Sequence, residues 1–338
     1  MVPSTMKVLE LGAYGGAVRV VERSVPVPGR GEVLVRMAAA PVNPSDLKFI
    51  RGVYGLRKPL PVVPGFEGSG TVVAAGGGLR AKVMNGRRVG CLAPDSGDGT
   101  WAEYMLAEAA KCIALRKDVT LEQGAMMVVN PWTAWALLET ARRGGHRAAV
   151  HTAAAGALGQ MMARLARRLG FPMVHVVRSE RRFETLRAQG AEHVLRTDAP
   201  DFDARLKDLC ERLGATIVFD PVAGEMTGRA LAAMPHGSRA VVYGTLSRKP
   251  CAVPPELLLY EGKRVEGFWL ARWVRGRSLL GRMRIAVGVQ KRLGTDFRTS
   301  VRARVPLEGA AAAIAEYERD PGAGKVLIVP GTAEPPGR

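Results

Sequence analysis

The clearest chemical signal in this 338-residue sequence is a run of small residues at positions 154–159, between an apolar stretch and an amphipathic one. The run matches A-x-G-x-x-G, a dinucleotide-binding fingerprint whose glycines let the backbone approach a pyrophosphate and let a helix pack on a strand. Free N–H groups at the start of that helix would bind the phosphates. We therefore predict a nucleotide site with contacts from Ala154, Gly156, Ala157, Leu158 and Gly159.

The choice of nucleotide depends on the residue that follows the next strand, about 20 residues beyond the fingerprint. An acidic side chain there would bind the ribose 2′-hydroxyl of NAD, but this sequence has Arg178, followed by Ser179. Because a guanidinium can bind a 2′-phosphate through two parallel hydrogen bonds, we predict NADPH as the cofactor. Two alternatives stay open: Arg178 could be an ordinary surface arginine, and Glu180 leaves room for NAD.

Residues that could ligate a metal are scattered along the chain. The four cysteines have neither C-x-x-C nor zinc-finger spacing, and the five histidines show no ligand spacing. We therefore predict no metal site and no disulfide framework. Such cysteine usage is typical of the reducing cytoplasm, which is the compartment that we expect.

The chain has a net charge of +18, and 38 of its 49 basic residues are arginine. This charge could attract nucleic acid, or it could be a solvated arginine-rich surface, since no basic run exceeds three residues. No apolar stretch reaches the roughly 20 residues that a membrane span needs, and the N-terminus lacks a signal-peptide pattern. We expect a protein that is neither secreted nor inserted into a membrane, with nucleic acid only as a remote alternative partner.

The elements that must position these residues differ between two parts of the chain. Residues 1–120 contain short strands separated by Gly/Pro turns, which is typical of a sandwich or distorted barrel. From residue 121, strand and helix signals alternate, as a parallel α/β sheet requires. The expected strands are 7–11, 17–22, 32–37, 71–75, 148–152, 173–177, 194–195, 216–220 and 239–244, and the expected helices are 158–169, 183–189 and 202–213.

Two further expectations follow from this order of elements. Tyr243 and Gly244 end a predicted strand of the parallel sheet, where ligands bind in open α/β folds, so we add them to the cofactor contacts. After about residue 271 we expect one more helix, a polar turn and a final strand at 325–329. A chain that ends on such a strand often returns to complete its first domain.

Several segments in order carry a family resemblance. They are APVNPSD (40–46), GVYG (52–55), VPGFEGSG (63–70), NPWTA (130–134), GAEHV (190–194), FDPVAG (219–224) and GFWL (267–270). With them, the chain resembles the zinc-independent branch of the medium-chain dehydrogenase/reductase superfamily, which holds zeta-crystallin-type quinone oxidoreductases and 2-enoyl thioester reductases. The resemblance implies an α/β fold with a β-rich GroES-like catalytic domain at 1–121, completed by 272–338, and a six-stranded Rossmann domain at 122–271. It also implies a homodimer.

The resemblance also suggests catalytic residues. Zinc-dependent members carry a metal-binding histidine where this sequence has Phe66, although the carboxylates Asp46 and Glu67 remain. Tyr54 is similar in position to a tyrosine that enoyl thioester reductases use near the substrate, where it would donate a hydrogen bond or a proton. Alternatively, Tyr54 is a turn residue that packs on the barrel. Asn43 resembles the family's cleft asparagine and is expected to contact the substrate.

Four other residues complete the predicted site. Thr133 matches a threonine near the nicotinamide, and is expected to act in catalysis and in cofactor binding. Trp269 and Trp273 could belong to the core or could line a substrate channel. Lys325 could reach the cofactor or could cap a strand.

Reduction without a metal favours a conjugated acceptor, whose carbonyl spreads the charge left by hydride addition. The best hypothesis is an NADPH-dependent reductase of 2-enoyl thioesters, either CoA esters or acyl-carrier thioesters. The alternative is an NADPH-dependent quinone or enone oxidoreductase. A remote third hypothesis is an NADPH-binding protein whose main role is to bind nucleic acid.

Overall fold

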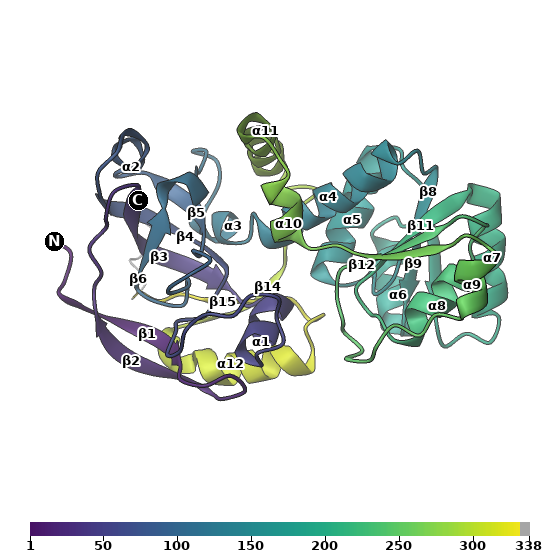
Figure 1. Ribbon diagram of the computed structural model, residues 1–338, viewed down its shortest axis with the longest axis horizontal. Coiled ribbons are helices and arrows are strands. Elements are labelled where there is room, and N and C mark those ends of the chain that lie inside the picture. The colour runs from purple at the N-terminus through teal and green to yellow at the C-terminus, as the bar shows by residue number, and fades with distance from the viewer. Residues whose placement is uncertain (332–338) are drawn as a thin grey trace. The chain divides into compact units, whose positions relative to one another are not determined.

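The computed structural model describes residues 1–331, and their contacts divide the chain into two compact units. The first unit contains Met1–Val129, Ala286–Gly294 and the segment from Arg298 onward, and the second contains Asn130–Ile285 and Thr295–Phe297. The sequence predicts domain boundaries near residues 121 and 271. They stay a prediction of which segments fold as independent domains. Figure 1 shows the elements of both units along the chain.

The first unit is built on a sheet with the strand order β14-β15-β3-β4-β5-β7, in which β6 also pairs with β3. A separate antiparallel pair, β1-β2, completes its β-structure. The strands are β1 (Thr5–Leu11), β2 (Val18–Ser24), β3 (Glu32–Pro41), β4 (Glu67–Ala75), β5 (Arg88–Leu92), β6 (Tyr104–Glu108), β7 (Cys112–Ala114), β14 (Val301–Val305) and β15 (Lys325–Ile328). The helices are α1 (Pro44–Ile50), α2 (Leu79–Met84), the 3₁₀ turn η1 (Ala109–Lys111), α3 (Leu121–Ala125) and α12 (Leu307–Arg319).

Strand β3 holds this sheet together because it has partners along both edges. It pairs antiparallel with β4 and β6, and its end pairs with β15, where Leu327 lies opposite Pro41. One core packs Phe49 and Trp101 against Ile314 and Tyr317 of α12. The C-terminal segment thus adds β15 and α12 to the sheet and core of the first unit.

The second unit contains a six-stranded parallel sheet in the order β10-β9-β8-β11-β12-β13. Its strands are β8 (Ala148–His151), β9 (Met173–Val177), β10 (His193–Arg196), β11 (Ala215–Asp220), β12 (Arg239–Val242) and β13 (Arg264–Gly267). Its helices are α5 (Ala157–Arg168), α6 (Glu180–Ala188), α7 (Phe202–Leu213), α8 (Glu225–Ala232), α9 (Pro255–Leu259) and α10 (Leu270–Arg275), while α4 (Val129–Arg143) and α11 (Leu279–Gln290) have residues in both units. One core packs β8, β9 and β11 against α7, α8 and α9. This is the predicted six-stranded Rossmann-type sheet.

The spacing of apolar residues predicted most helices and strands of the second unit correctly, but it predicted too few elements after residue 271. The strand at 173–177 and the helix at 202–213 have the predicted bounds, whereas β12 ends at Val242, so Tyr243 and Gly244 follow the strand rather than end it. The prediction of a single helix after residue 271 is wrong, because α11, β14 and α12 all lie there. Strand β14 has the alternating apolar and polar residues of a strand, but its polar positions in VRARV are arginines. Within residues 1–331, no helix has the length and apolar character needed to span a bilayer.

Candidate functional site

The fingerprint turn lies between β8 and α5, where the sequence predicted it. Gly156 is the N-cap of α5 and has extended backbone angles, φ −68° and ψ 166°. A Cβ at position 159 would lie 2.2 Å from the Ala154 carbonyl oxygen, so only glycine allows the helix to pack this closely on the turn. A Cβ at position 156 would meet nothing closer than the Ala153 carbonyl oxygen at 3.5 Å. The turn is therefore closed at Gly159, where a side chain would clash, and open at Gly156, where nothing blocks the backbone. A pyrophosphate needs this arrangement to approach the backbone.

A buried carboxylate holds the loop that follows β11. Asp220 is fully buried and accepts hydrogen bonds from the hydroxyls of Thr152 (2.5 Å) and Thr227 (2.6 Å). It also accepts hydrogen bonds from the backbone N–H groups of Val222 (2.8 Å) and Ala223 (3.2 Å). Because Thr152 directly follows β8, Asp220 connects the start of the fingerprint loop with the start of α8. The sequence motif FDPVAG contains this residue, but its anchoring role was not predicted.

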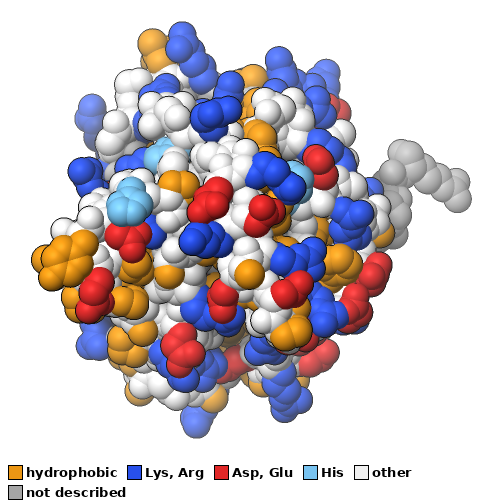
Figure 2. Space-filling model, turned by 90° about the vertical axis from the view of Figure 1, so that its right-hand side faces the viewer, with side chains coloured by type: hydrophobic (Ala, Val, Ile, Leu, Met, Phe, Trp, Pro, Cys, Tyr) orange, Lys and Arg blue, Asp and Glu red, His pale blue; other side chains and the backbone are white. Residues whose placement is uncertain are grey.

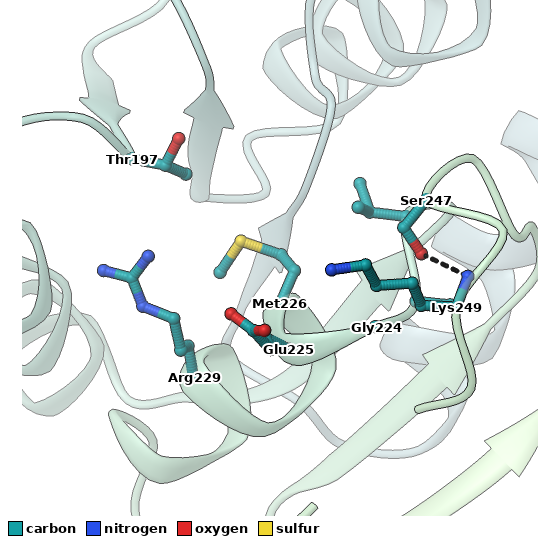
Figure 3. Close-up of a pocket in the computed structure, with 9 residues that line it drawn as sticks. Thr197, Gly224, Glu225, Met226, Arg229, Ser247 and Lys249 are labelled. Carbon is teal, nitrogen blue, oxygen red and sulfur yellow. Dashed lines mark hydrogen bonds between the residues drawn. The ribbon is translucent and has the colours of Figure 1, made fainter. Parts of the chain in front are cut away.

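A cavity of about 250 Å³ lies at the carboxyl edge of this sheet, where loops follow β10, β11 and β12 (Figure 3). Arg229 and Lys249 approach it from opposite sides in Figure 3. Arg229 also forms a two-pronged ion pair with Asp203, at 3.1 and 3.0 Å. The lining residues are Thr197, Val222, Ala223, Gly224, Glu225, Met226, Arg229, Ser247 and Lys249. This position is the one at which open α/β sheets bind ligands.

The residues predicted to select the cofactor follow β9. Arg178 is exposed, and Ser179 is the N-cap of α6. Glu180, the carboxylate that left room for NAD, forms an ion pair with Arg196. That contact gives the acidic side chain a partner within the protein.

Tyr243 points its hydroxyl into the unit. Its Oη lies 2.7 Å from Nε2 of His151, and the two rings stack with centroids 6.0 Å apart. Burial lowers the pKa of His151 to about 3, so the imidazole is neutral at ordinary pH, and burial raises the pKa of Tyr243 well above its usual value. The predicted cofactor contact from Tyr243 would therefore come from its ring or its backbone.

The other predicted residues of the second unit lie on helices. Thr133 is buried on α4. Trp269 is the N-cap of α10, and the guanidinium of Arg275 lies 5.6 Å from its ring centroid. Arg277 lies 4.2 Å from the ring centroid of Trp273. Among residues 1–331, the buried indole N–H of Trp273 has no hydrogen-bond partner.

In the first unit, Asn43 lies in a buried polar cluster. Its Nδ2 donates to Oε1 of Glu67 at 3.0 Å, and its Oδ1 accepts a hydrogen bond from Nζ of Lys325. The second carboxylate oxygen of Glu67 accepts from the backbone N–H groups of Val128 (3.0 Å) and Val129 (2.9 Å). Asn43, Glu67 and Lys325 are each at most 3% exposed. The amide of Asn43 is thus fixed by one acidic and one basic partner.

Asp46 adds a second carboxylate to this cluster. It accepts hydrogen bonds from the backbone N–H groups of Asn43 (2.7 Å) and Phe66 (3.0 Å). Burial raises its pKa to about 7, while the Asn43 N–H and the Lys325 charge oppose the shift. Burial also raises the pKa of Glu67, and it lowers the pKa of Lys325 to about 8 against the attraction of both carboxylates. The cluster therefore contains three groups that can change charge.

Comparisons with known proteins agree with this fold and these motifs. The model of the alcohol dehydrogenase GroES-like domain matches residues 29–117, and the model of the zinc-binding dehydrogenase family matches residues 157–283. A mitochondrial enoyl-[acyl-carrier-protein] reductase from Xenopus tropicalis is 32% identical over 269 residues, which cover 76% of this chain and 74% of that protein. The chain belongs to the medium-chain dehydrogenase/reductase superfamily. The predicted family is confirmed.

Solved structures place the chain near the quinone reductases of this superfamily. A protein described as an NADPH:quinone reductase from Mesorhizobium loti is 36% identical, with a TM-score of 0.89 over 98% of this chain and all of that one. The quinone oxidoreductase from Thermus thermophilus, studied also as its complex with NADPH, is 27% identical, with a TM-score of 0.75 over 96% of this chain and 100% of that one. The chain is an oxidoreductase of the superfamily's enoyl reductase and quinone oxidoreductase branch.

The residues at the superfamily's zinc position do not fit a zinc ion. Phe66 is a hydrocarbon ring, and the oxygens of Asp46 and Glu67 accept hydrogen bonds from backbone or amide N–H groups. Among the described residues, no group of three or more His, Cys, Asp or Glu side chains could hold a metal ion. Phe66 instead packs on Tyr54, with ring centroids 4.9 Å apart, and on Phe49 at 5.5 Å. The aromatic ring thus supports the tyrosine predicted to act in catalysis.

Proposed function

We propose that this oxidoreductase uses NADPH to reduce a conjugated acceptor, with a 2-enoyl thioester as the best candidate. The observation that carries the proposal is the fingerprint turn, open at Gly156 and followed after β9 by Arg178 rather than by a carboxylate. The similarity to an enoyl-[acyl-carrier-protein] reductase supports the choice of acceptor. When bound, NADPH would supply a hydride.

The protein's contribution to cofactor binding comes from three places in the second unit. The N–H groups at the start of α5 bind the pyrophosphate, as at other helix N-termini. Arg178 binds the 2′-phosphate, and the cavity beside Arg229 and Lys249 holds part of the adenosine moiety. Thr133, Ser179, Tyr243, Gly244 and Lys325 remain predicted contacts.

Replacement of Arg178 tests the cofactor assignment. We predict that Arg178→Ala weakens NADPH binding by about tenfold to a hundredfold, because a charge-assisted contact contributes about 1.5–3 kcal/mol. NADH binding should stay nearly unchanged, and so should NADPH binding in the control Arg212→Ala, which removes an exposed arginine of α7. Both affinities can be measured by fluorescence titration. Equal, tight binding of NADH and NADPH by the unmodified protein would contradict the assignment.

Tyr54 and Asn43 are the proposed catalytic groups of the first unit. Hydride addition to the β-carbon leaves negative charge on the carbonyl oxygen and the α-carbon. The Tyr54 hydroxyl donates a hydrogen bond or a proton to that charge, while Phe66 holds its ring. Asn43 remains a predicted substrate contact, while its amide is fully buried and is held by Glu67 and Lys325. Trp269 and Trp273 remain predicted substrate contacts.

Steady-state kinetics test this role. We predict that Tyr54→Phe lowers kcat by about 10²–10⁴-fold with crotonyl-CoA, because general acid catalysis typically contributes that much. The NADPH affinity should not change, and Tyr260→Phe, at an exposed tyrosine, should be silent. A kcat within about twofold of the unmodified enzyme would make Tyr54 a packing residue.

The quinone or enone reductase is the second candidate, since the M. loti protein matches this chain over its full length. NADPH oxidation with a panel of crotonyl-CoA, quinones and short enones distinguishes the two.

Nucleic-acid binding has weaker support: on the face shown in Figure 2, basic side chains are interspersed with acidic and apolar ones and form no continuous stripe. Retention of RNA that falls with salt, without NADPH turnover, would favour that third hypothesis.

We also propose a homodimer, formed where β13 ends the Rossmann sheet. The N–H groups of Arg264 and Phe268 bond to the preceding strand region, so those of Val265 and Gly267 face the open edge. Two antiparallel copies centred on Val265 would place Arg264 opposite Glu266 of the second copy, which pairs opposite charges. Val265→Pro removes an edge N–H and should yield monomers in sedimentation, whereas Val265→Ala should not.

We propose a cytoplasmic location, which fits four free cysteines.

A further inference from the structure

Two cysteines of the first unit face each other across a pair of neighbouring strands. Cys91 of β5 and Cys112 of β7 are direct partners in the antiparallel register. Both are free thiols, both are at most 2% exposed, and both belong to the same apolar core. Neither residue belongs to the proposed catalytic or cofactor site, so any chemistry of this pair is independent of the proposed function.

The hydrogen bonds of this strand pair determine how close the two cysteines lie. The Leu115 N–H donates to the Arg88 carbonyl at 2.9 Å, which makes these opposed residues a hydrogen-bonded pair. Hydrogen-bonded and non-hydrogen-bonded pairs alternate along an antiparallel ladder. The cysteine pair is three positions away (88 to 91), so it is a non-hydrogen-bonded pair. Cα atoms of such pairs lie about 4.5 Å apart, within the range of about 4.4–6.8 Å that a disulfide spans.

Access to the thiols depends on β7. This strand has only three residues, forms the edge of its sheet and pairs with β5. While it is closed, burial raises the pKa of Cys112 to about 12 and raises that of Cys91 well above its usual value, so thiolates are scarce. A short edge strand opens locally at a lower free-energy cost than the strands inside a sheet. Opening of β7 would expose both thiols together.

We propose that Cys91 and Cys112 are an oxidation site that forms a cross-strand disulfide when a peroxide reaches the opened edge of the sheet. One thiolate attacks the O–O bond of hydrogen peroxide, which forms a sulfenic acid and releases one water once the leaving hydroxide is protonated. The second thiol then displaces hydroxide from that sulfur, which forms the S–S bond and a second water. Two thiols and one peroxide thus become one disulfide and two waters.

The test uses the folded full chain carrying Cys251→Ser, which removes the exposed cysteine. After treatment with hydrogen peroxide and unfolding in an alkylating agent, peptide mass spectrometry should find residues 91 and 112 linked, lighter by two hydrogens and unalkylated. Cys210 is the internal control, since it is equally buried but lies alone on α7. It should remain fully alkylatable. Reduction with dithiothreitol should restore alkylation of the linked pair.

A second variant separates a paired site from two independent thiols. In Cys112→Ala, peroxide should convert Cys91 to sulfenic and then sulfinic acid, without any disulfide within the chain. In the unmodified chain those products should be absent at the same exposure, because Cys112 intercepts the sulfenic acid. The proposal is overturned if Cys91 and Cys112 stay as alkylatable as Cys210, or if each is oxidised separately without a linked peptide. Because the first experiment needs neither cysteine replaced, a poorly folded variant does not decide the result.

Discussion

Each unit buries carboxylates beneath its candidate site, but the two units neutralise them differently. In the second unit, Asp220 accepts four hydrogen bonds, all from hydroxyl or backbone N–H groups, which carry no formal charge. In the first unit, Glu67 and Asp46 lie close to the amino group of Lys325, which influences both of their pKa values. Neutral donors cannot titrate, whereas an ammonium group can. The comparison indicates that the carboxylates of the first cluster have a partner whose charge depends on pH, whereas the donors to Asp220 are uncharged throughout.

We expect the largest loss of stability when Asp220 is replaced, because all of its hydrogen-bond donors are uncharged groups that lose their acceptor. We predict that Asp220→Ala destabilises the protein by about 4 kcal/mol, because three buried donors and the half-buried Val222 N–H lose their acceptor at about 1 kcal/mol or more each. The cost can be measured by urea unfolding at one pH. Asp203→Ala is the matched control, since its carboxylate is 65% exposed in its ion pair with Arg229 and should contribute about 1 kcal/mol or less. Similar losses in the two variants would contradict the anchoring role of Asp220.

The next effect is the pH dependence of the first cluster. Asp46 has a folded pKa of about 7 against a usual value of 3.8, so the folded state binds the extra proton and stability should fall as pH rises through this range. Lys325 has a folded pKa of about 8 against 10.5, so the unfolded state binds the extra proton above pH 8 and stability should then rise. We predict that the contribution of this cluster to stability has a minimum between about pH 7 and 8, with limbs of a few kcal/mol at about 1.4 kcal/mol per pKa unit. Buried His151 adds a rise with pH below about 6.5 in the unmodified protein and in variants alike, so the cluster's contribution is the difference between their curves.

Two substitutions identify the group that causes each side of the curve of stability against pH. In urea unfolding across the pH range, Asp46→Asn should remove most of the fall on the acid side. Lys325→Met should remove the rise on the alkaline side. A pH profile that neither substitution changes would show that the cluster does not titrate as described.

The smallest effect concerns the link between Glu67 and Asn43. We predict that Glu67→Ala destabilises the protein by about 2–3 kcal/mol, since three donors lose their acceptor, and that Glu67→Gln recovers most of this loss by retaining an acceptor oxygen. Both values can be measured by urea unfolding at one pH. If Asn43 orients the acceptor, KM should rise more in Glu67→Ala than in Glu67→Gln. Equal effects of the two substitutions would mean that only the charge of Glu67 matters.

The sequence predicted the second unit better than the first for a physical reason. Strands β8 and β9 and helix α5 have local signatures, namely an apolar run, the fingerprint turn and helical spacing, and each can be recognised within a few residues. The cluster around Asn43 has no such signature, because its partners Glu67 and Lys325 come from distant strands. In the sequence its carboxylates stand only as remnants of a metal site, and no local pattern indicates that Lys325 would bind the Asn43 amide.

Strand β15 has a consequence for how the protein is made. Because β15 pairs with β3, the sheet of the first unit lacks a strand until residues 325–328 have been translated. The second unit has all six strands between Ala148 and Gly267, so it can fold while the ribosome is still synthesising α12. Asn43 is synthesised 282 residues before Lys325 and meets it only after β15 has been made. A chain that terminates early should therefore contain a folded Rossmann sheet beside an incomplete N-terminal sheet, with its edge open to other nascent chains.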